Sequence, residues 1–299
     1  MRLAAIDIGS NAGRLLINDV LRGPGGTVEF IKMALIRVPL RLGFDVFETG
    51  RISVEREEMM IKTLQSYRLL MDVYGVQQYR AAATSAMRGA ANSKEVLEKI
   101  ERETGIRIEV IDGHEEARLL HESHEAEKLS NLNSYLYINV GGGSTELTFF
   151  SEGQLQFNES FDIGTIRLLK DQVGKPDWEK LKDFIRERTR GRHVTCIGSG
   201  GNINKIFSLS KKKEGKPLNL EHLRNYYKEF SSLSLRQRMQ LYKLREDRAD
   251  VIVPALLIYI NVMRWVDAED IFVPKMGVAD GLIHSLFESL TKHEPEKWV

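Results

Sequence analysis

The sequence contains almost no cysteine. Cys196 is the only one among 299 residues, and this excludes a fold held together by disulfide bonds within the chain. Such sparse use of cysteine is typical of a reducing compartment, and we therefore expect a cytoplasmic protein. Because Cys196 ends an apolar strand, we expect its thiol to be packed in the core and not to act as a nucleophile.

The sequence also lacks a long hydrophobic run and a strong net charge. The longest apolar stretch, residues 251–266, is interrupted by Pro254 and Arg264, so we expect no membrane span. The N-terminus has neither the basic region nor the cleavage site of a signal peptide. The formal net charge is +1. No overall field therefore attracts nucleic acid or a membrane surface, and any anion site must be local.

Three consecutive glycines interrupt the most β-rich part of the chain. Residues 135–150, YLYINVGGGSTELTFF, predict a strand, a turn at Gly141–Gly143 and a second strand. A tight hairpin needs only two turn residues, and the third glycine suggests close approach of a ligand to the backbone. The N–H groups of such a turn suit a phosphate. Ser144 and Thr145 add hydroxyl donors and Glu146 adds a carboxylate. An ordinary glycine hairpin is the alternative interpretation.

A second turn of the same design lies near the N-terminus. The run Leu3–Ile8 is apolar except for Asp7, residues 9–13 interrupt it, and Arg14–Val20 resume it. Two such hairpins in one chain suggest an internal duplication. We predict an α/β protein made of two βββαβα lobes around a cleft, with the boundary in the polar linker near Ser130–Ser134. The lobes would then span residues 1–130 and 131–299.

Hydrophobic periodicity and glycine positions predict the remaining elements. After the first hairpin we expect strands and helices at residues 28–40, 55–74, 76–83, 92–104, 106–111 and 114–129. Asn92 and Glu95 have the spacing of a capping box. In the second half, a glycine turn at residues 198–201 follows a strand and opens a helix, which suits phosphate or nucleotide at the helix N-terminus.

Six motifs occur in one order: DIGSNAGR, ATSAMR, DGHEEARL, VGGGSTEL, IGSGGNINKI and RADVIVPALLI. Together, and over nearly the whole chain, they resemble the exopolyphosphatase / guanosine pentaphosphate phosphohydrolase family in its short two-domain form. The resemblance implies a two-domain actin-like ATPase (ribonuclease H-like) fold. It implies removal of the terminal phosphoryl group of polyphosphate or guanosine pentaphosphate by water, with Mg²⁺ as cofactor. It also implies a homodimer.

The same resemblance implies roles for single residues. Glu116 matches the glutamate that activates the attacking water, and Glu146 matches a carboxylate that holds Mg²⁺ or orients that water. The positions that match phosphate-binding residues are Ser10, Asn11, Arg14, Arg88, Gly142, Gly143, Ser144 and Thr145. The positions that match the third glycine turn are Gly198, Gly200 and Gly201.

One position departs from the family pattern. The family usually has aspartate two residues before the glycine triplet, where this chain has Asn139. Asparagine is neutral and is a weaker ligand for a hard cation, and Asp7 in the first hairpin is the other candidate ligand beside Glu146. This departure leaves an alternative, a weak or non-catalytic binding protein for polyphosphate or guanosine tetraphosphate. The turn at Gly198 leaves another, an ATP-dependent kinase or ATPase of the same superfamily.

Other charged groups have a plainer explanation. Glu115 suits the solvated face of a helix near its N-terminus. His121 and His124 are three residues apart, but no further ligand is spaced convincingly for zinc. The basic clusters at residues 186–192 and 211–216 are typical of solvated surface, and guidance of a long polyanion is the alternative.

Overall fold

The structure is a computed structural model that describes residues 1–23, 27–122, 134–274 and 277–293. It divides into two compact units, residues 1–123 with 276–299 and residues 124–275, and each is described by itself. The expected linker near Ser130–Ser134 lies outside the described residues except for Ser134. No helix within the described ranges is long and apolar enough to cross a membrane.

The first unit is built on a sheet with the strand order β3-β2-β1-β4-β5. The first three strands, β1 (Arg2–Ile8), β2 (Gly13–Arg22) and β3 (Val28–Val38), form an antiparallel meander. β4 (Gln78–Ala83) then pairs parallel to β1, and β5 (Glu109–Val110) pairs parallel to β4. The predicted strand at residues 106–111 is therefore only two residues long.

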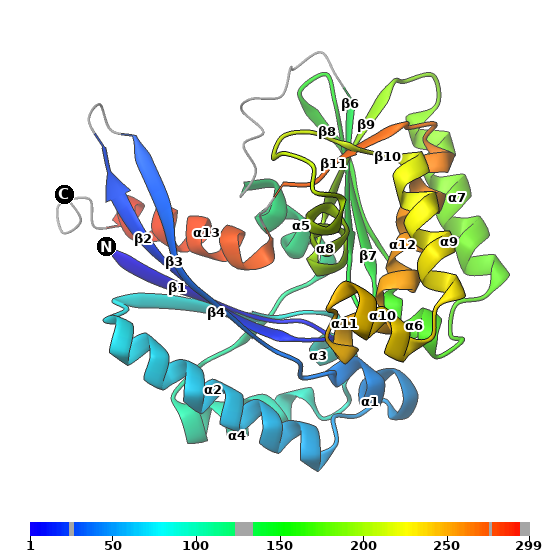
Figure 1. The fold of residues 1–299 in the computed structure, drawn as a ribbon. Coiled ribbons are helices and arrows are strands. Elements are labelled where there is room, and N and C mark those ends of the chain that lie inside the picture. The colour runs from blue at the N-terminus through cyan, green and yellow to red at the C-terminus, as the bar shows by residue number, and fades with distance from the viewer. Residues whose placement is uncertain (24–26, 123–133, 275–276, 294–299) are drawn as a thin grey trace. The chain divides into compact units, whose positions relative to one another are not determined.

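Helices cover both faces of this sheet. Along β1, Ala4 and Ile6 pack in the core that includes α2 (Val54–Tyr74), while Leu3 and Ala5 pack on the opposite face against α13 (Val278–His293). Figure 1 shows α2 and α13 on the two sides of the strands. The remaining helices are α1 (Leu42–Thr49), α3 (Ser85–Gly89), α4 (Ser93–Thr104) and α5 (Gly113–Glu122).

The helix α13 corrects the predicted domain limits. The sequence places residues 131–299 in one lobe, but the compact unit that contains β1 also includes α13. The reason is packing, because Leu282 and Ile283 are buried in the same cluster as Leu3 and Leu16. Without α13, the apolar side chains on that face of β1 and β2 would be exposed to water.

The predicted capping box at Asn92 is wrong, although α4 begins where expected. The Asn92 side chain makes no capping hydrogen bond. Its Oδ1 accepts from the N–H of Ile52 and its Nδ2 donates to the carbonyl of Ile52, each at 2.9 Å. Buried backbone groups need partners, and Asn92 supplies both for the segment that precedes α2.

The second unit repeats the arrangement of the first. Its sheet has the order β10-β11-β9-β6-β7-β8. β6 (Ser134–Val140), β7 (Thr145–Ser151) and β8 (Gln154–Phe161) form an antiparallel meander, and β9 (Val194–Ser199) pairs parallel to β6. The strands β10 (Leu218–Asn219) and β11 (Asp270–Phe272) complete the sheet. The order β3-β2-β1-β4 thus corresponds to β8-β7-β6-β9, and the predicted duplication is confirmed.

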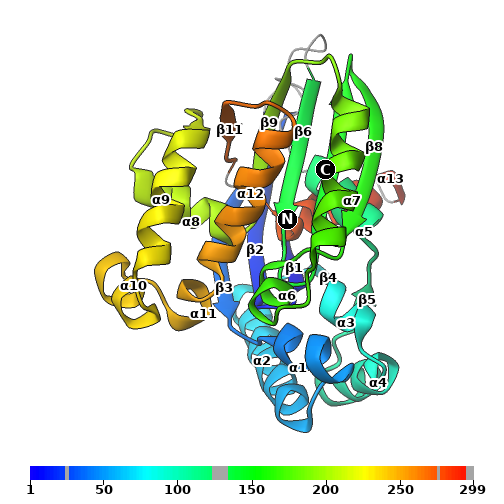
Figure 2. The ribbon, with the colours of Figure 1, turned by 90° about the vertical axis from the view of Figure 1, so that its right-hand side faces the viewer.

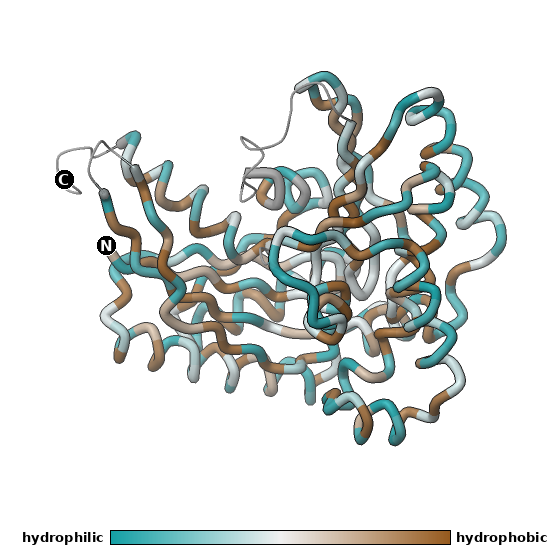
Figure 3. The backbone as a smooth tube through the Cα atoms, turned by 45° about the horizontal axis from the view of Figure 1, so that its top comes forward, coloured by the Kyte–Doolittle hydropathy of each residue, from teal (hydrophilic) through white to brown (hydrophobic). Residues whose placement is uncertain are grey.

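The long helix α12 (Ile252–Trp265) is central to the core of this unit. Leu136 and Ile138 of β6 share one cluster with Leu256 and Tyr259 of α12. Figure 2 shows α12 between α9 and α7, and Figure 3 shows hydrophobic and hydrophilic stretches alternating along the backbone. The other helices are α6 (Thr165–Leu169), α7 (Lys175–Thr189), α8 (Gly201–Ser210), α9 (Leu220–Ser232), α10 (Leu235–Tyr242) and α11 (Glu246–Ala249).

Candidate active site

The turn between β1 and β2 is held by backbone hydrogen bonds. The N–H of Gly9 donates to the carbonyl of Ala12 at 3.0 Å. The carbonyl of Ser10 accepts from the N–H of Gly43 at 2.8 Å, which ties the turn to α1. The Ser10 hydroxyl lies 2.8 Å from the hydroxyl of Ser85, the first residue of α3. The turn is therefore braced from two sides.

Asp7 and Arg14 are cross-strand partners in this hairpin and form an ion pair. Asp7 is buried, while about a third of the Arg14 side chain, 32%, is exposed. A buried carboxylate requires a partner, and Arg14 supplies the positive charge for Asp7. The expected metal ligand and the expected phosphate contact are thus paired with each other.

Arg88 and Glu116 lie at the edge of the sheet where parallel strands end. The N–H of Thr84, after β4, donates to the carbonyl of Ile8 at the end of β1, at a distance of 3.1 Å. The guanidinium of Arg88 donates to the carbonyl of Ile111 at 2.6 Å, just before the helix that carries Glu116. The carboxyl ends of parallel strands are the usual place for ligands in open α/β sheets.

Glu116 lies in the first turn of α5. Asp112 begins this turn, because its Oδ1 accepts from the N–H of Glu115 at 2.8 Å and its carbonyl accepts from the N–H of Glu116 at 3.0 Å. The Glu116 residue is only 7% exposed. A carboxylate in this position is favoured by the helix dipole, and burial distinguishes it from an ordinary surface glutamate.

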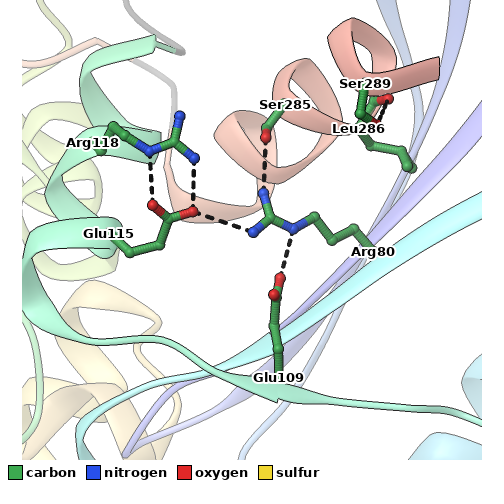
Figure 4. Close-up of polar contacts among 7 residues, drawn as sticks. All are labelled: Arg80, Glu109, Glu115, Arg118, Ser285, Leu286 and Ser289. Atoms are coloured by element: carbon green, nitrogen blue, oxygen red, sulfur yellow. Dashed lines mark hydrogen bonds and ion pairs between the residues drawn. The ribbon is translucent and has the colours of Figure 1, made fainter. Parts of the chain in front are cut away.

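An ion-pair network that the sequence did not indicate fixes α5 on the sheet (Figure 4). Arg80 of β4 donates to Glu109 of β5 at 2.5 Å, to Glu115 of α5 at 3.2 Å and to Ser285 of α13 at 2.8 Å. Arg118 donates twice to Glu115, each time at 2.7 Å. The hydrogen bond from Arg118, and then the one from Arg80, holds the pKa of Glu115 below its usual value. Glu115 therefore has a structural role.

The glycine turn of the second unit directs its carbonyls toward α6. The carbonyls of Gly141 and Gly142 accept from the N–H groups of Thr165 and Ile166 at 3.0 and 2.8 Å. The Gly143 carbonyl accepts from the guanidinium of Arg167 at 2.8 Å. Among the described residues, no backbone hydrogen bond uses the N–H of Gly142 or Gly143 as donor. These two N–H groups are therefore candidates for the predicted phosphate contact, which stays a prediction.

Gly164, which the sequence analysis missed, explains the close fit between this turn and α6. A Cβ atom at Gly164 would lie 2.3 Å from the carbonyl oxygen of Gly142, so only glycine fits. The hydroxyl of Thr145 donates to the carbonyl of Ile163, the residue before Gly164, at 2.5 Å. A signal was present: residues 162–165, DIGT, repeat the pattern of residues 7–10, DIGS.

Glu146 accepts hydrogen bonds from three neutral groups. It is 2% exposed and is the cross-strand partner of Asn139. Its Oε1 accepts from the hydroxyls of Ser144 at 2.5 Å and Ser160 at 3.3 Å. Its Oε2 accepts from Nδ2 of Asn139 at 3.0 Å. Ser160 was not predicted, because it is distant from the motif in sequence and meets it only across the β7–β8 pair.

These donors do not fit a resident Mg²⁺ ion, which requires several oxygen ligands in near-octahedral geometry. Asp7 is paired with Arg14, and Asn139 presents an N–H group to Glu146 where a second oxygen ligand would be needed. No group of three or more His, Cys, Asp or Glu residues in the described part of the chain could hold a metal ion. The His121 and His124 side chains lie outside the described residues.

Packing accounts for the glycines of the third turn. A Cβ atom at Gly198 would lie 2.8 Å from Cδ1 of Ile271. Gly200 has a φ of 108°, which favours glycine, and a Cβ atom at Gly201 would lie 2.9 Å from Nη1 of Arg248. The predicted contact of this turn with phosphate or nucleotide stays a prediction. So does the expected cleft.

Comparison with known proteins places these features in a family context. The model of the Ppx/GppA phosphatase family matches residues 25–290. The chain is 26% identical to exopolyphosphatase 1 of Mycobacterium tuberculosis over 95% of its length and 87% of that protein. It is 25% identical to a guanosine-5'-triphosphate,3'-diphosphate pyrophosphatase of Aeromonas salmonicida, covering 95% of this chain and 59% of that protein.

A solved structure shares the fold. The Ppx/GppA family member of Aquifex aeolicus, 26% identical, superposes with a TM-score of 0.74 over 97% of this chain and 98% of that one. The expected α/β fold class is thereby confirmed, together with the resemblance read from the six motifs.

Proposed function

This chain belongs to the Ppx/GppA phosphatase family, and we propose that it is a hydrolase that releases the terminal phosphate of inorganic polyphosphate or guanosine pentaphosphate by attack of water. Its relatives, named as an exopolyphosphatase and a guanosine-5'-triphosphate,3'-diphosphate pyrophosphatase, support this reaction class. Neither name supports the alternatives of a kinase or a binding protein without activity.

One observation carries the proposal. The glycine turn after β6 binds α6 through its carbonyls, which leaves the N–H groups of Gly142 and Gly143 for a phosphate. The carboxylate of Glu146, held in place by Ser144 and Asn139, belongs to the same hairpin. Phosphoryl transfer depends mainly on positioning and on stabilisation of the charge that develops on the phosphoryl oxygens, and fixed N–H groups provide such stabilisation without reorganisation.

The family pattern assigns the remaining chemistry to two carboxylates and an arginine. Glu116 accepts a proton from the attacking water while the water oxygen bonds to the terminal phosphorus and the bridging P–O bond breaks. Glu146 orients the water or the phosphoryl group, and Arg88 adds positive charge. We propose that Mg²⁺ is required and that it arrives bound to the phosphates of the substrate.

A homodimer and a cytoplasmic location are further parts of this proposal. β3 is an edge strand of its sheet, and Ile31, Met33 and Leu35 on it are each more than two-fifths exposed, at 42%, 43% and 54%. Long apolar edges tend to pair with another chain, and a second copy is the occupant that we propose. Light scattering of the wild type and of Met33→Lys tests it: a monomeric wild type contradicts a dimer, and a dimer in both contradicts the use of β3.

The test of the hydrolase is a phosphate-release assay. Pure protein is incubated with long-chain polyphosphate, guanosine pentaphosphate or ATP, with and without Mg²⁺. We expect release from at least one of the first two substrates and little from ATP. Release from ATP alone would favour an ATPase. Tight binding of polyphosphate without any release would favour a binding protein.

A further inference from the structure

We propose that Asn139 is a positioning residue that holds the buried carboxylate of Glu146 by a hydrogen bond, and that this pocket has no divalent cation of its own. The Asn139 amide occupies the position next to Glu146. A carboxylate at that position would need a cation to compensate the two negative charges. The proposal deepens the proposed function, on which it rests for the catalytic meaning of Glu146. The cation part can be tested on the protein without substrate.

The first argument is the number of donors already at Glu146. The carboxylate is 2% exposed, and Asn139 is 8% exposed. An ionised carboxylate is costly to bury without compensating hydrogen bonds or charge. Here Oε1 accepts from the hydroxyls of Ser144 and Ser160, and Oε2 accepts from the Asn139 amide. Each oxygen has a directed donor, and each of these three donors is neutral.

The second argument is that the Asn139 side chain has a determined orientation. Its Oδ1 accepts from the hydroxyl of Ser199 at 3.4 Å, and its Nδ2 donates to Glu146 at 3.0 Å. Turning the amide over would place an oxygen at 3.0 Å from a carboxylate oxygen, where neither atom can donate. Asn139 therefore presents N–H groups to Glu146, while its Oδ1, the only atom with which the amide could bind a cation, is directed to Ser199.

The third argument is the register of the sheet. Asn139 is opposite Glu146 on β7 and opposite Ser199 on β9. All three side chains therefore lie in one row across neighbouring strands. The backbone fixes this row, so the pocket is complete before any ligand binds. It follows that the position of Glu146 does not depend on Mg²⁺.

A single substitution should convert this pocket into one that binds a divalent cation. Asn139→Asp keeps the size of the side chain but replaces the donor with a second carboxylate in contact with Glu146. Like charges at this separation cannot both remain ionised without a compensating proton or cation. Asn139→Asp is therefore expected to be less stable than the wild type without divalent cations, and Mg²⁺ should bind between the two carboxylates and restore much of the loss.

The experiment is thermal unfolding of the substrate-free protein at neutral pH in EDTA and in rising Mg²⁺. A ligand that binds only the folded state raises Tm in proportion to the logarithm of its concentration above Kd. We expect no Mg²⁺-dependent rise for the wild type and a clear rise for Asn139→Asp. The matched control is Asn219→Asp. It adds the same charge at the N-cap of α9, where aspartate caps a helix as well as asparagine does, and it should behave as the wild type.

A second measurement covers the case in which Asn139→Asp does not fold. Calorimetric titration of Mg²⁺ into wild-type protein should detect no binding without substrate. Asn139→Ala should lower kcat and leave KM within a few-fold, because Glu146 loses a donor while the phosphate-binding turn is intact. The proposal is wrong if Mg²⁺ binds the substrate-free wild type, if wild type and Asn139→Asp gain equal Tm from Mg²⁺, or if Asn139→Ala keeps full kcat.

These outcomes are separate from those of the proposed function. A protein that releases no phosphate from any substrate, but shows the expected difference in Mg²⁺ response between wild type and Asn139→Asp, contradicts the hydrolase and supports the cation-free pocket. An active hydrolase whose wild type binds Mg²⁺ without substrate contradicts the pocket alone.

Discussion

Glu115 and Glu116 are neighbours in sequence, yet their side chains have different surroundings. Glu115 forms ion pairs with Arg80 and Arg118. Glu116 takes no part in those ion pairs and is 7% exposed. Successive residues on a helix point in different directions. The ion pairs of Glu115 fix the orientation of α5 and therefore also the direction of the Glu116 side chain. Substitution of Glu116 should therefore affect turnover, and substitution of Glu115 should affect stability.

The first prediction concerns Glu116→Gln, with Glu115→Gln as the matched control. Removing a general base typically lowers turnover by about 10²–10⁴-fold, and we expect Glu116→Gln to lose about that factor with KM within a few-fold. Glu115→Gln should keep most of its turnover and lose stability. Steady-state kinetics and thermal unfolding of both variants decide. Equal turnover in the two variants would contradict the role of Glu116.

The second prediction concerns pH. The folded-state pKa of Glu115 is lowered from 4.5 by Arg118 and Arg80. A carboxyl group with a lowered folded-state pKa stabilises the protein. The full stabilisation is present at pH values above the unfolded-state pKa, and it is lost as the pH falls through the folded-state pKa. Wild type should therefore lose more stability than Glu115→Gln when the pH is lowered from neutral to below the folded-state pKa. Parallel loss in both proteins, measured by urea unfolding, would contradict the assigned ion pairs.

The third prediction concerns Gly164, the N-cap of α6. A Cβ atom there would overlap the backbone of Gly142, at 2.3 Å from its oxygen. The turn would have to move, and overpacking of this kind typically costs about 1–3 kcal/mol. Gly174→Ala is the matched control. It is also a helix N-cap glycine, but its nearest contact would be an ordinary 3.4 Å to Pro176.

The readouts for Gly164→Ala are stability and substrate binding. We expect it to be destabilised and to bind polyphosphate more weakly, because the N–H groups of Gly142 and Gly143 are displaced with the turn. Gly174→Ala should change stability by about 1 kcal/mol or less and leave binding intact. If the two variants behave alike in chemical denaturation and in polyphosphate binding, the packing of α6 against the turn is not what positions it.

The fourth prediction concerns Cys196. The residue is fully buried at 0% exposure, and burial raises the pKa of its thiol far above the usual value. Since the thiolate is the reactive form, native protein should not react with a thiol reagent such as dithionitrobenzoate, and Cys196→Ala should keep full turnover. Rapid labelling of the native protein would show that β9 opens easily. Unfolded protein should react with one equivalent.

Much of the fold could be predicted because it depends on local patterns. Two hairpins with glycine turns and the helix at residues 55–74 have periodicities that few other structures satisfy, and the structure contains them. Two features were harder to predict from the sequence. The segment after Ile106 looked like a strand but contributes only Glu109–Val110 to the sheet. Asn92 has the spacing of a cap but binds Ile52, forty residues away along the chain.

The candidate site divides in the same way. The resemblance of the motifs to the family selected Glu116, Glu146 and the turn at Gly142 as candidates, and their roles stay predictions. The motifs did not reveal Arg80, Gly164 or Ser160, each of which acts on a residue brought near by strand pairing or helix packing.

The sequence by itself determined the family and the duplicated βββ arrangement, since these follow from short-range order along the chain. Only the tertiary structure decided that α13 completes the first unit and that Asn139 donates to Glu146. The physical reason is that a buried charge or an apolar face is stabilised by whatever group the fold brings into contact with it. Such contacts join positions that no local pattern connects.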